Sequence, residues 1–210
     1  MAKIRLKWIL TIIIISLLFI KPKTIEVNKF DVSLKNNEIL INFIINDYIN
    51  GLYIQNNDIN TLVILDYKND IKNLEKALKS YDINTIDKLY TVFPTIVEIF
   101  GIKSEYYKTD NNLIMFNFYN NNFCVYIEDY QTKPDLNLCK FLYMFKFKTG
   151  ILNDLIGNPE IIFQTEHNPL PVKTQELIYE NWTELYTINN DEYTILKVTK
   201  ENFDVLMISK

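Results

Sequence analysis

Residues 70–91, DIKNLEKALKSYDINTIDKLYT, predict a helix that is followed after a short turn by a strand. Asp70 is a residue type that caps helix N-termini, and apolar side chains recur at helical spacing over residues 71–78. The helix is therefore expected over residues 70–80, with one apolar face directed at a core. Residues 86–92 are rich in apolar and β-branched side chains, which is typical of a strand. The stretch predicts a domain that mixes helices with strands.

Short apolar runs of the kind found in strands fill most of the chain from residue 26 onward. Asn-rich turns separate several runs, because Asn tolerates the left-handed backbone that turns need. The pattern predicts an α+β domain without internal repeats, with hairpins over Asn120-Asn121 and Asn190-Asp191. Strands are expected over residues 26–32, 38–46, 51–55, 61–66, 112–119, 122–128, 141–147, 160–164, 186–189, 193–198 and 204–208. Further helices are expected over residues 151–156 and 172–181.

Residues 8–20, WILTIIIISLLFI, form an apolar run that only Thr11 and Ser16 interrupt. The run is shorter than the roughly 20 residues of a typical spanning helix, but lysines at both ends extend it by reaching to the membrane interfaces. No small-residue cleavage site follows, so residues 1–24 are predicted to be an uncleaved signal anchor. The alternative, a buried core helix, would require apolar surroundings on every side of the run.

The charges around this run predict its orientation in a membrane. Three basic residues precede it, and Lys21 and Lys23 follow it. This bias favours a cytoplasmic N-terminus. The domain over residues 25–210 is therefore expected outside the cytoplasm, held at the cell membrane by a single pass.

The net charge of the chain argues against a nucleic-acid partner. The sequence has 22 basic and 26 acidic side chains, which gives a formal net charge of −4. Leaving out the three basic residues before the apolar run leaves 19 against 26, or −7. Proteins that bind duplexes normally present a basic excess. The expected partners are the membrane, through residues 8–20, and a protein that the sequence does not identify.

The two cysteines, Cys124 and Cys139, have no Cys or His neighbour at metal-ligand spacing. A disulfide between them would suit a location outside the cytoplasm. Two buried free thiols are an alternative that the sequence favours at least as much.

Several stretches, taken in chain order, resemble one known family. Residues 74–91 are the most specific, because their helix, turn and Ile-Asp strand follow the spacing of "LLPYLKSHGIKKIDLLILTH". Residues 61–66 (TLVILD) are similar to "NILIDTG", and residues 112–129 (NLIMFNFYNNNFCVYIED) to "NSLVLRLEYGNFSFLLTGD". Over about residues 26–208 the chain resembles the metallo-β-lactamase-type hydrolase domain at the C-terminus of ComEC-family DNA-uptake proteins. The resemblance implies a metallo-β-lactamase-like αββα sandwich, full or reduced.

The residues that bind two metal ions in that family are missing from this chain. After Thr91 the family has His-x-His-x-Asp-His, whereas residues 92–97 read VFPTIV. Residues 145–147 (FKF) stand where the family has a later His-His-Gly, and His167 is the only histidine. A two-metal site needs several fixed nitrogen and oxygen ligands. We therefore expect no catalytic, cofactor-binding or metal-binding residues, and a cleft closed by apolar packing.

Two functions from different classes remain. In the first, the chain is a membrane-anchored pseudoenzyme with a binding or structural role outside the cytoplasm, linked to DNA uptake or the cell envelope. In the second, it is a residual metal-dependent hydrolase that uses Asp66, Asp129 and His167 with one metal ion. Two carboxylates without several imidazoles suit only a weakly held hard cation. The first function is therefore favoured.

Overall fold

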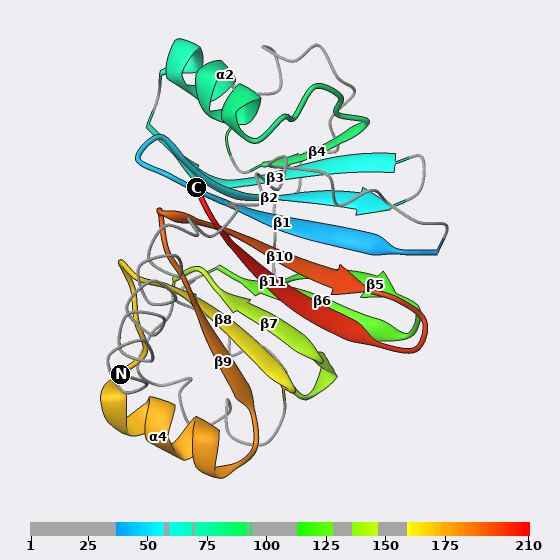
Figure 1. Cartoon of the computed structure of the whole chain (residues 1–210), viewed down its shortest axis with the longest axis vertical. Coiled ribbons are helices and arrows are strands. Elements are labelled where there is room, and N and C mark those ends of the chain that lie inside the picture. The colour runs from blue at the N-terminus through cyan, green and yellow to red at the C-terminus, as the bar shows by residue number, and fades with distance from the viewer. Residues whose placement is uncertain are drawn as a thin grey trace, which may run out of the picture. The chain divides into compact units, whose positions relative to one another are not determined.

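The computed structural model describes residues 37–56, 59–68, 70–91, 93, 113–127, 136–146 and 159–210. Within these residues the chain forms two β-sheets, two α-helices and one short 3-10 helix, η1 (Leu136–Leu138) (Figure 1). This mixture of two sheets with few helices confirms the α+β class. The predicted strand over residues 26–32 and the predicted helix over residues 151–156 lie outside the described residues.

Sheet A has the strand order β11-β10-β1-β2-β3-β4. Its strands are β1 (Ile39–Ile45), β2 (Ile49–Asn56), β3 (Ile59–Tyr67), β4 (Lys88–Thr91), β10 (Glu192–Val198) and β11 (Phe203–Ser209). All neighbouring pairs are antiparallel except β3 and β4, which are parallel. A parallel pair needs a crossover connection, and helix α2 (Ile71–Ser80) supplies it.

Sheet B has the strand order β5-β6-β7-β8-β9. Its strands are β5 (Leu113–Phe118), β6 (Asn121–Tyr126), β7 (Phe141–Met144), β8 (Ile161–Thr165) and β9 (Glu184–Ile188). Strands β5 and β6 form an antiparallel hairpin, and β6 to β9 are parallel. Helix α4 (Val172–Glu180) makes the crossover from β8 to β9. Among the described residues, each sheet therefore contains one β–α–β unit, β3–α2–β4 in sheet A and β8–α4–β9 in sheet B.

The two sheets pack face to face, and alternate side chains from both fill the space between them. Phe43 of β1 contacts three rings of sheet B. Its ring centroid lies 6.2 Å from that of Phe123, 5.2 Å from that of Tyr143 and 4.6 Å from that of Phe163. Aromatic pairs at such distances add to the stabilisation from buried area alone. The main core of the domain is thus the interface between the sheets.

Helix α2 covers the outer face of sheet A. Its predicted N-cap is confirmed, because the Asp70 carboxylate accepts a hydrogen bond of 3.2 Å from the Asn73 backbone N–H. Leu74 and Leu78, on the predicted apolar face, are buried. On the side of sheet A away from the main core, Tyr193 of β10 donates to the Ser80 carbonyl at the end of α2.

Helix α4 covers the outer face of sheet B, where Ile178 packs with Leu142, Met144 and Ile162 of the sheet. The layers therefore follow the order α2, sheet A, sheet B, α4 (Figure 1). This arrangement is the αββα sandwich that the sequence predicts.

A disulfide joins Cys124 of β6 to Cys139, which lies just before β7. Both residues are buried in the cluster beneath α4. The alternative of two free thiols is therefore wrong. The sequence left the pairing open, because two cysteines 15 residues apart meet only if their strands are neighbours.

The predicted hairpin over Asn190-Asp191 is wrong. Strand β9 pairs with β8 in sheet B, whereas β10 pairs with β1 and β11 in sheet A. The Asn190-Asp191 turn carries the chain from one sheet to the other, so its residues give a turn without a hairpin. The other predicted hairpin is confirmed, but its turn is shifted by one residue to Tyr119 and Asn120, which both have positive φ.

The predicted anchor over residues 8–20 lies outside the described residues. Among the residues that the structure does describe, no helix is long and apolar enough to cross a membrane. The anchor therefore stays a prediction.

We expect the disulfide to contribute substantially to stability. Replacing both Cys124 and Cys139 with alanine frees a loop of 15 residues, which lowers the free energy of unfolding by about 3 kcal/mol. Urea unfolding of the detergent-solubilised chain measures this loss. Met115→Ala, at an exposed position of β5, is the control, with an expected change within about 0.5 kcal/mol. Two free thiols per chain, titrated after unfolding of protein purified from an oxidising compartment, would contradict the assignment.

Candidate functional site

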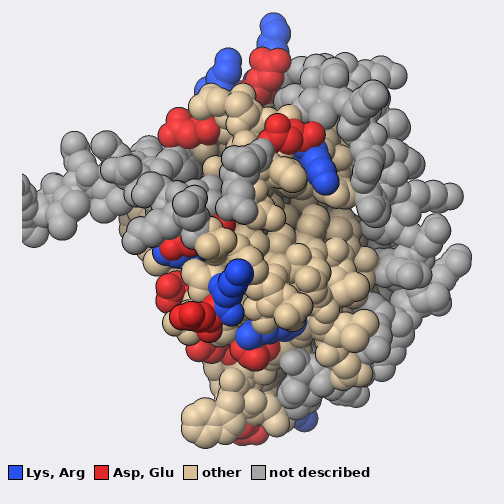
Figure 2. Space-filling model, turned by 90° about the vertical axis from the view of Figure 1, so that its right-hand side faces the viewer, with Lys and Arg blue, Asp and Glu red and all other residues tan. Residues whose placement is uncertain are grey.

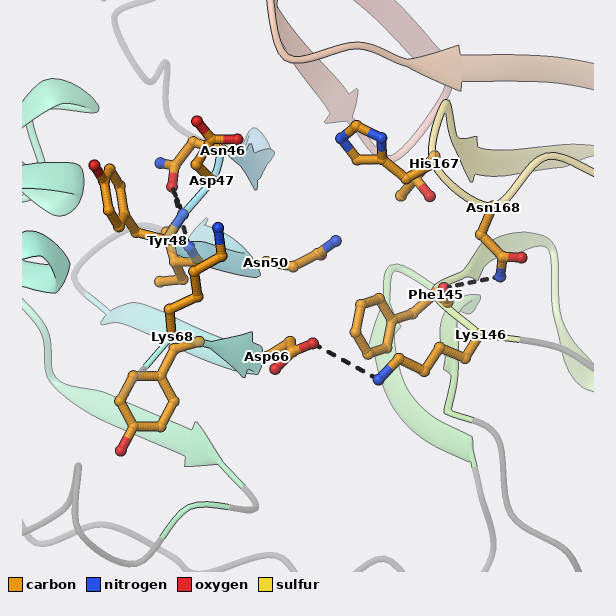
Figure 3. Close-up of a pocket in the computed structure, with 13 residues that line it drawn as sticks. Asn46, Asp47, Tyr48, Asn50, Asp66, Lys68, Phe145, Lys146, His167 and Asn168 are labelled. Atoms are coloured by element: carbon orange, nitrogen blue, oxygen red, sulfur yellow. Dashed lines mark hydrogen bonds and ion pairs between the residues drawn. The ribbon is translucent and has the colours of Figure 1, made fainter. Parts of the chain in front are cut away.

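An open cleft lies where strand ends of the two sheets meet (Figure 3). Its volume is about 540 Å³. One wall comes from sheet A, from the β1–β2 turn and the end of β3, and the other from sheet B, from the ends of β7 and β8. The lining residues are Asn46, Asp47, Tyr48, Ile49, Asn50, Asp66, Tyr67, Lys68, Phe145, Lys146, Thr165, His167 and Asn168. We call this feature the strand-end cleft.

The β1–β2 turn is fixed by the side chain of Asn46. Its carbonyl oxygen accepts hydrogen bonds from the backbone N–H groups of Tyr48, at 2.8 Å, and Ile49, at 3.0 Å. Asn favours such turns because its side chain imitates a backbone carbonyl. The turn places Tyr48 at the rim of the cleft, where its side chain is 41 % exposed.

An irregularity in the pairing of β2 with β3 sets the direction of Asp66. Asn50 is opposite Asp66 and Gly51 is opposite Ile64, so Leu65 has no partner on β2. Such a β-bulge bends a strand and redirects the neighbouring side chain. Asp66 points across the cleft toward sheet B (Figure 3).

Gly51 permits the close approach of the two strands at this bulge. A Cβ atom at this position would lie 2.2 Å from the backbone carbonyl oxygen of Val63. That separation is far below van der Waals contact, and a backbone oxygen held in a sheet has little room to move. The side chain at position 51 must therefore be absent if the bulge is to form.

A hydrogen bond between the sheets forms the inner end of the cleft. The Tyr143 hydroxyl of β7 donates to the side-chain oxygen of Asn50 at 2.8 Å. Burial raises the pKa of Tyr143 strongly, so the hydroxyl stays protonated and donates to Asn50 at neutral pH. The bond fixes the Asn50 amide with its nitrogen directed into the cleft (Figure 3).

An ion pair spans the cleft from one sheet to the other. The Lys146 ammonium, just after β7, lies 3.6 Å from the Asp66 carboxylate. Both side chains are 52 % exposed, so the pair contributes little to stability. The Lys146 ammonium also lies 4.9 Å from the centroid of the Phe145 ring. Among the described residues of the cleft, Asp66 is the carboxylate that points across it, and it already has a cation beside it (Figure 3).

The turn after β8 forms the opposite wall. His167 and Asn168 follow the strand, and the Asn168 side chain donates to the Phe145 carbonyl at 3.4 Å. The Nε2 atom of His167 lies 3.2 Å from the side-chain nitrogen of Asn190 and 3.7 Å from the Glu166 carboxylate. His167 thus belongs to a hydrogen-bonded network as well as to the cleft.

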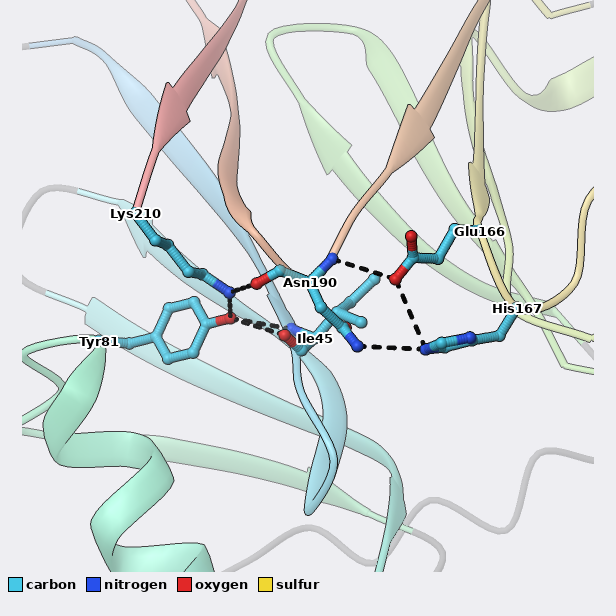
Figure 4. A network of polar contacts seen from close by, with 6 residues as sticks. All are labelled: Ile45, Tyr81, Glu166, His167, Asn190 and Lys210. Carbon is cyan, nitrogen blue, oxygen red and sulfur yellow. Dashed lines mark hydrogen bonds and ion pairs between the residues drawn. The ribbon is translucent and has the colours of Figure 1, made fainter.

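This network connects the two walls behind the cleft (Figure 4). Asn190 bonds through its backbone N–H to Glu166 and through its carbonyl to the Lys210 ammonium. The same ammonium donates to the Tyr81 hydroxyl at 3.1 Å, and that hydroxyl donates to the Ile45 carbonyl at 2.9 Å. Burial raises the pKa of Tyr81 to about 12, so it remains a donor at neutral pH. The chain of bonds ends at Ile45, directly before the β1–β2 turn.

The structure brings two of the three residues of the hydrolase alternative to the strand-end cleft. Asp66 and His167 lie on its opposite walls. Asp129 lies outside the described residues. Within the described part of the chain, no group of three or more His, Cys, Asp or Glu side chains is placed to hold a metal ion.

The expectation of a cleft closed by apolar packing is wrong for the described residues. Phe93, which stands in the stretch that carries metal ligands in the resembled family, does pack against Tyr67 at a centroid distance of 4.9 Å. The contact holds Tyr67 at one side and leaves the cleft open. The resemblance did place residues 145–147 at a metal-ligand position, but nothing in the sequence indicated that the Lys146 ammonium would meet Asp66. Nothing indicated Asn50 as a cleft residue either, because that position depends on pairing between distant strands.

Comparisons with known proteins concern the fold alone. No family model matches the chain, and no curated protein matches it significantly. Among solved structures, the chain is similar to the metallo-beta-lactamase fold protein YhfI from Bacillus subtilis, with 9 % sequence identity and a TM-score of 0.45. The match covers 77 % of this chain and 100 % of that chain. The αββα sandwich follows from the strand order and packing of this chain itself.

We expect Gly51→Ala to disturb both stability and the cleft. The added methyl group forces β2 and β3 apart at the bulge, which lowers the free energy of unfolding by roughly 1–3 kcal/mol. Urea unfolding measures the loss, and amide NMR shifts of Asn50 and Asp66 report the local change. Ser209→Ala, at an exposed strand position, serves as control. An unfolding free energy equal to that of the unchanged chain would show that the bulge is not formed as described.

Proposed function

We propose that the chain is a membrane-anchored, metal-independent pseudoenzyme with a metallo-β-lactamase-like domain, which binds a ligand in the strand-end cleft. Its fold is the α+β, αββα sandwich described above. Its role is one of binding or structure outside the cytoplasm, within an envelope or DNA-uptake assembly. The ComEC-family resemblance of residues 74–91 is the source of the link to DNA uptake.

One observation carries the proposal, the ion pair of Lys146 with Asp66. In the resembled family this part of the chain carries histidine ligands, and here it supplies an ammonium group. A positive charge 3.6 Å from the carboxylate repels a divalent cation that approaches the same oxygen atoms. Water activation for hydrolysis requires such a cation held by several ligands. The pair therefore supports a cleft that binds without catalysing.

The disulfide supports the proposed location. Disulfides persist in oxidising environments and are rare in the cytosol. Cys124 and Cys139 are buried and bonded, and the apolar run over residues 8–20 precedes the domain. A signal anchor with a cytoplasmic N-terminus would deliver the domain to such an environment.

Surface charge supports a protein partner over a nucleic-acid partner. Figure 2 shows one face of the molecule, on which basic and acidic side chains lie next to one another beside a broad area without charge. The formal net charge of the whole chain is −4. A nucleic-acid partner would favour a basic excess instead. Any role in DNA uptake would then operate through contacts with other proteins.

The residual hydrolase, with one metal ion on Asp66, Asp129 and His167, is the alternative. The open cleft with Asp66 and His167 on opposite walls favours it over other catalytic schemes. It requires Asp66 to leave Lys146 and bind the metal.

Metal analysis combined with hydrolysis assays separates the two functions. The full chain, purified in detergent without chelator, is analysed for zinc and manganese and then assayed with both ions on single-stranded DNA, cyclic dinucleotides and a chromogenic cephalosporin. We expect metal well below one ion per chain and no turnover. One metal ion per chain that is lost in Asp66→Asn, or turnover that is lost in Asp129→Ala, would establish the hydrolase instead.

A further inference from the structure

We infer that the ligand of the strand-end cleft is a neutral, polyhydroxylated molecule, a short oligosaccharide. The inference rests on the proposed metal-independent binding function. It follows from the balance of charge in the cleft, from the way its amide groups are fixed, and from its aromatic side chains.

Among the described residues that line the cleft, the charges of lysine and aspartate cancel. Lys68 and Lys146 supply two positive charges, and Asp47 and Asp66 supply two negative ones. Lys146 and Asp66 already neutralise each other. A ligand whose charge is directed at Lys146 or Asp66 would have to break that pair. A neutral ligand meets no such cost, and the exposed pair offers both donors and acceptors to hydroxyl groups.

The fold orients the amide side chains of the cleft and leaves part of their bonding capacity for a ligand. The oxygen of Asn50 accepts from Tyr143, so its nitrogen is left to donate into the cleft. The oxygen of Asn46 is held by the β1–β2 turn, and the nitrogen of Asn168 by the Phe145 carbonyl. Groups fixed in advance lose little entropy when they bind a ligand. A carbohydrate suits them because each of its hydroxyl groups both donates and accepts.

Aromatic side chains contribute at the rim of the cleft. Tyr48 is 41 % exposed, and the Lys68 ammonium lies 6.0 Å from the centroid of its ring. Tyr67 and Phe145 also line the cleft, but Phe145 is buried and Tyr67 packs against Phe93, so Tyr48 is the ring that a ligand can cover. Aromatic faces attract the weakly positive C–H groups that cover one face of a sugar ring. The cleft volume of about 540 Å³ lies within the range of small-ligand sites, roughly 300–1,000 Å³.

Calorimetric titration of the full chain tests the inference. The protein is kept in a detergent without a sugar head group, because a maltoside would compete. The neutral probes are triacetylchitotriose, cellotriose and maltotriose, and the anionic probes are inorganic phosphate and citrate. We expect at least one neutral trisaccharide to bind at millimolar concentration or below, and the anions to bind more weakly.

Two variants locate the binding. Tyr48→Ala removes the rim ring from a surface turn, and we expect at least about tenfold weaker binding of the trisaccharide. Asn50→Ala removes the fixed donor and should weaken binding by about fivefold or more. Tyr179→Ala, which removes a tyrosine 57 % exposed on α4, is the matched control and should bind as the unchanged chain does.

The outcomes distinguish this inference from the proposed function. Failure of all three trisaccharides to bind, tighter binding of phosphate or citrate, or full affinity in folded Tyr48→Ala would overturn the saccharide assignment. The proposed metal-independent function would survive each of these results. It falls only if metal content or turnover identifies a hydrolase.

Discussion

The apolar interface between the two sheets, to which Phe43 contributes three ring contacts, holds the two halves of the domain together. Phe43 comes from β1, whose neighbours β2 and β10 place it in the middle of sheet A. Its ring reaches Phe123, Tyr143 and Phe163, which belong to three adjacent strands of sheet B. Because protein interiors are closely packed, this contact sets how the sheets align. Every feature at the strand ends depends on that alignment.

The strand-end cleft is a consequence of the same packing. The apolar interface between the sheets ends at Asn50 and Tyr143, whose hydrogen bond is the first polar contact beyond the core. Past this bond the walls combine polar and charged side chains with aromatic ones, and the bulge near Gly51 turns Asp66 to meet Lys146. A sandwich of this kind leaves a cleft at its strand ends, and the side chains that line the cleft determine what it binds.

Local signals were sufficient to predict helix α2, the outer layer on sheet A. Asp70 caps α2 and Leu74 and Leu78 are buried, because capping and amphipathic spacing act within a few residues. The αββα layering followed from a resemblance in chain order. The predicted hairpin over Asn190-Asp191 was wrong because local signals do not determine which strands pair. A turn has the same residues whether its strands pair with each other or with β8 and β1, and only tertiary packing decides.

The candidate site was predictable only in part. Asp66 and His167 were identified as chemically relevant residues, and the structure places both at one cleft. The partner of Asp66 was missed because Lys146 is 80 positions away and reaches it through strand order and one bulge. No spacing rule in the sequence encodes that meeting. The cysteine pair was open for the same reason, since β6 and β7 had first to be placed side by side.

Anomalous X-ray scattering from crystals of the chain grown with excess zinc tests the central claim most directly. The account predicts no anomalous peak in the strand-end cleft, with the Lys146 ammonium still beside the Asp66 carboxylate. An ordered zinc ion bound by Asp66 and His167, with Lys146 displaced, would contradict it.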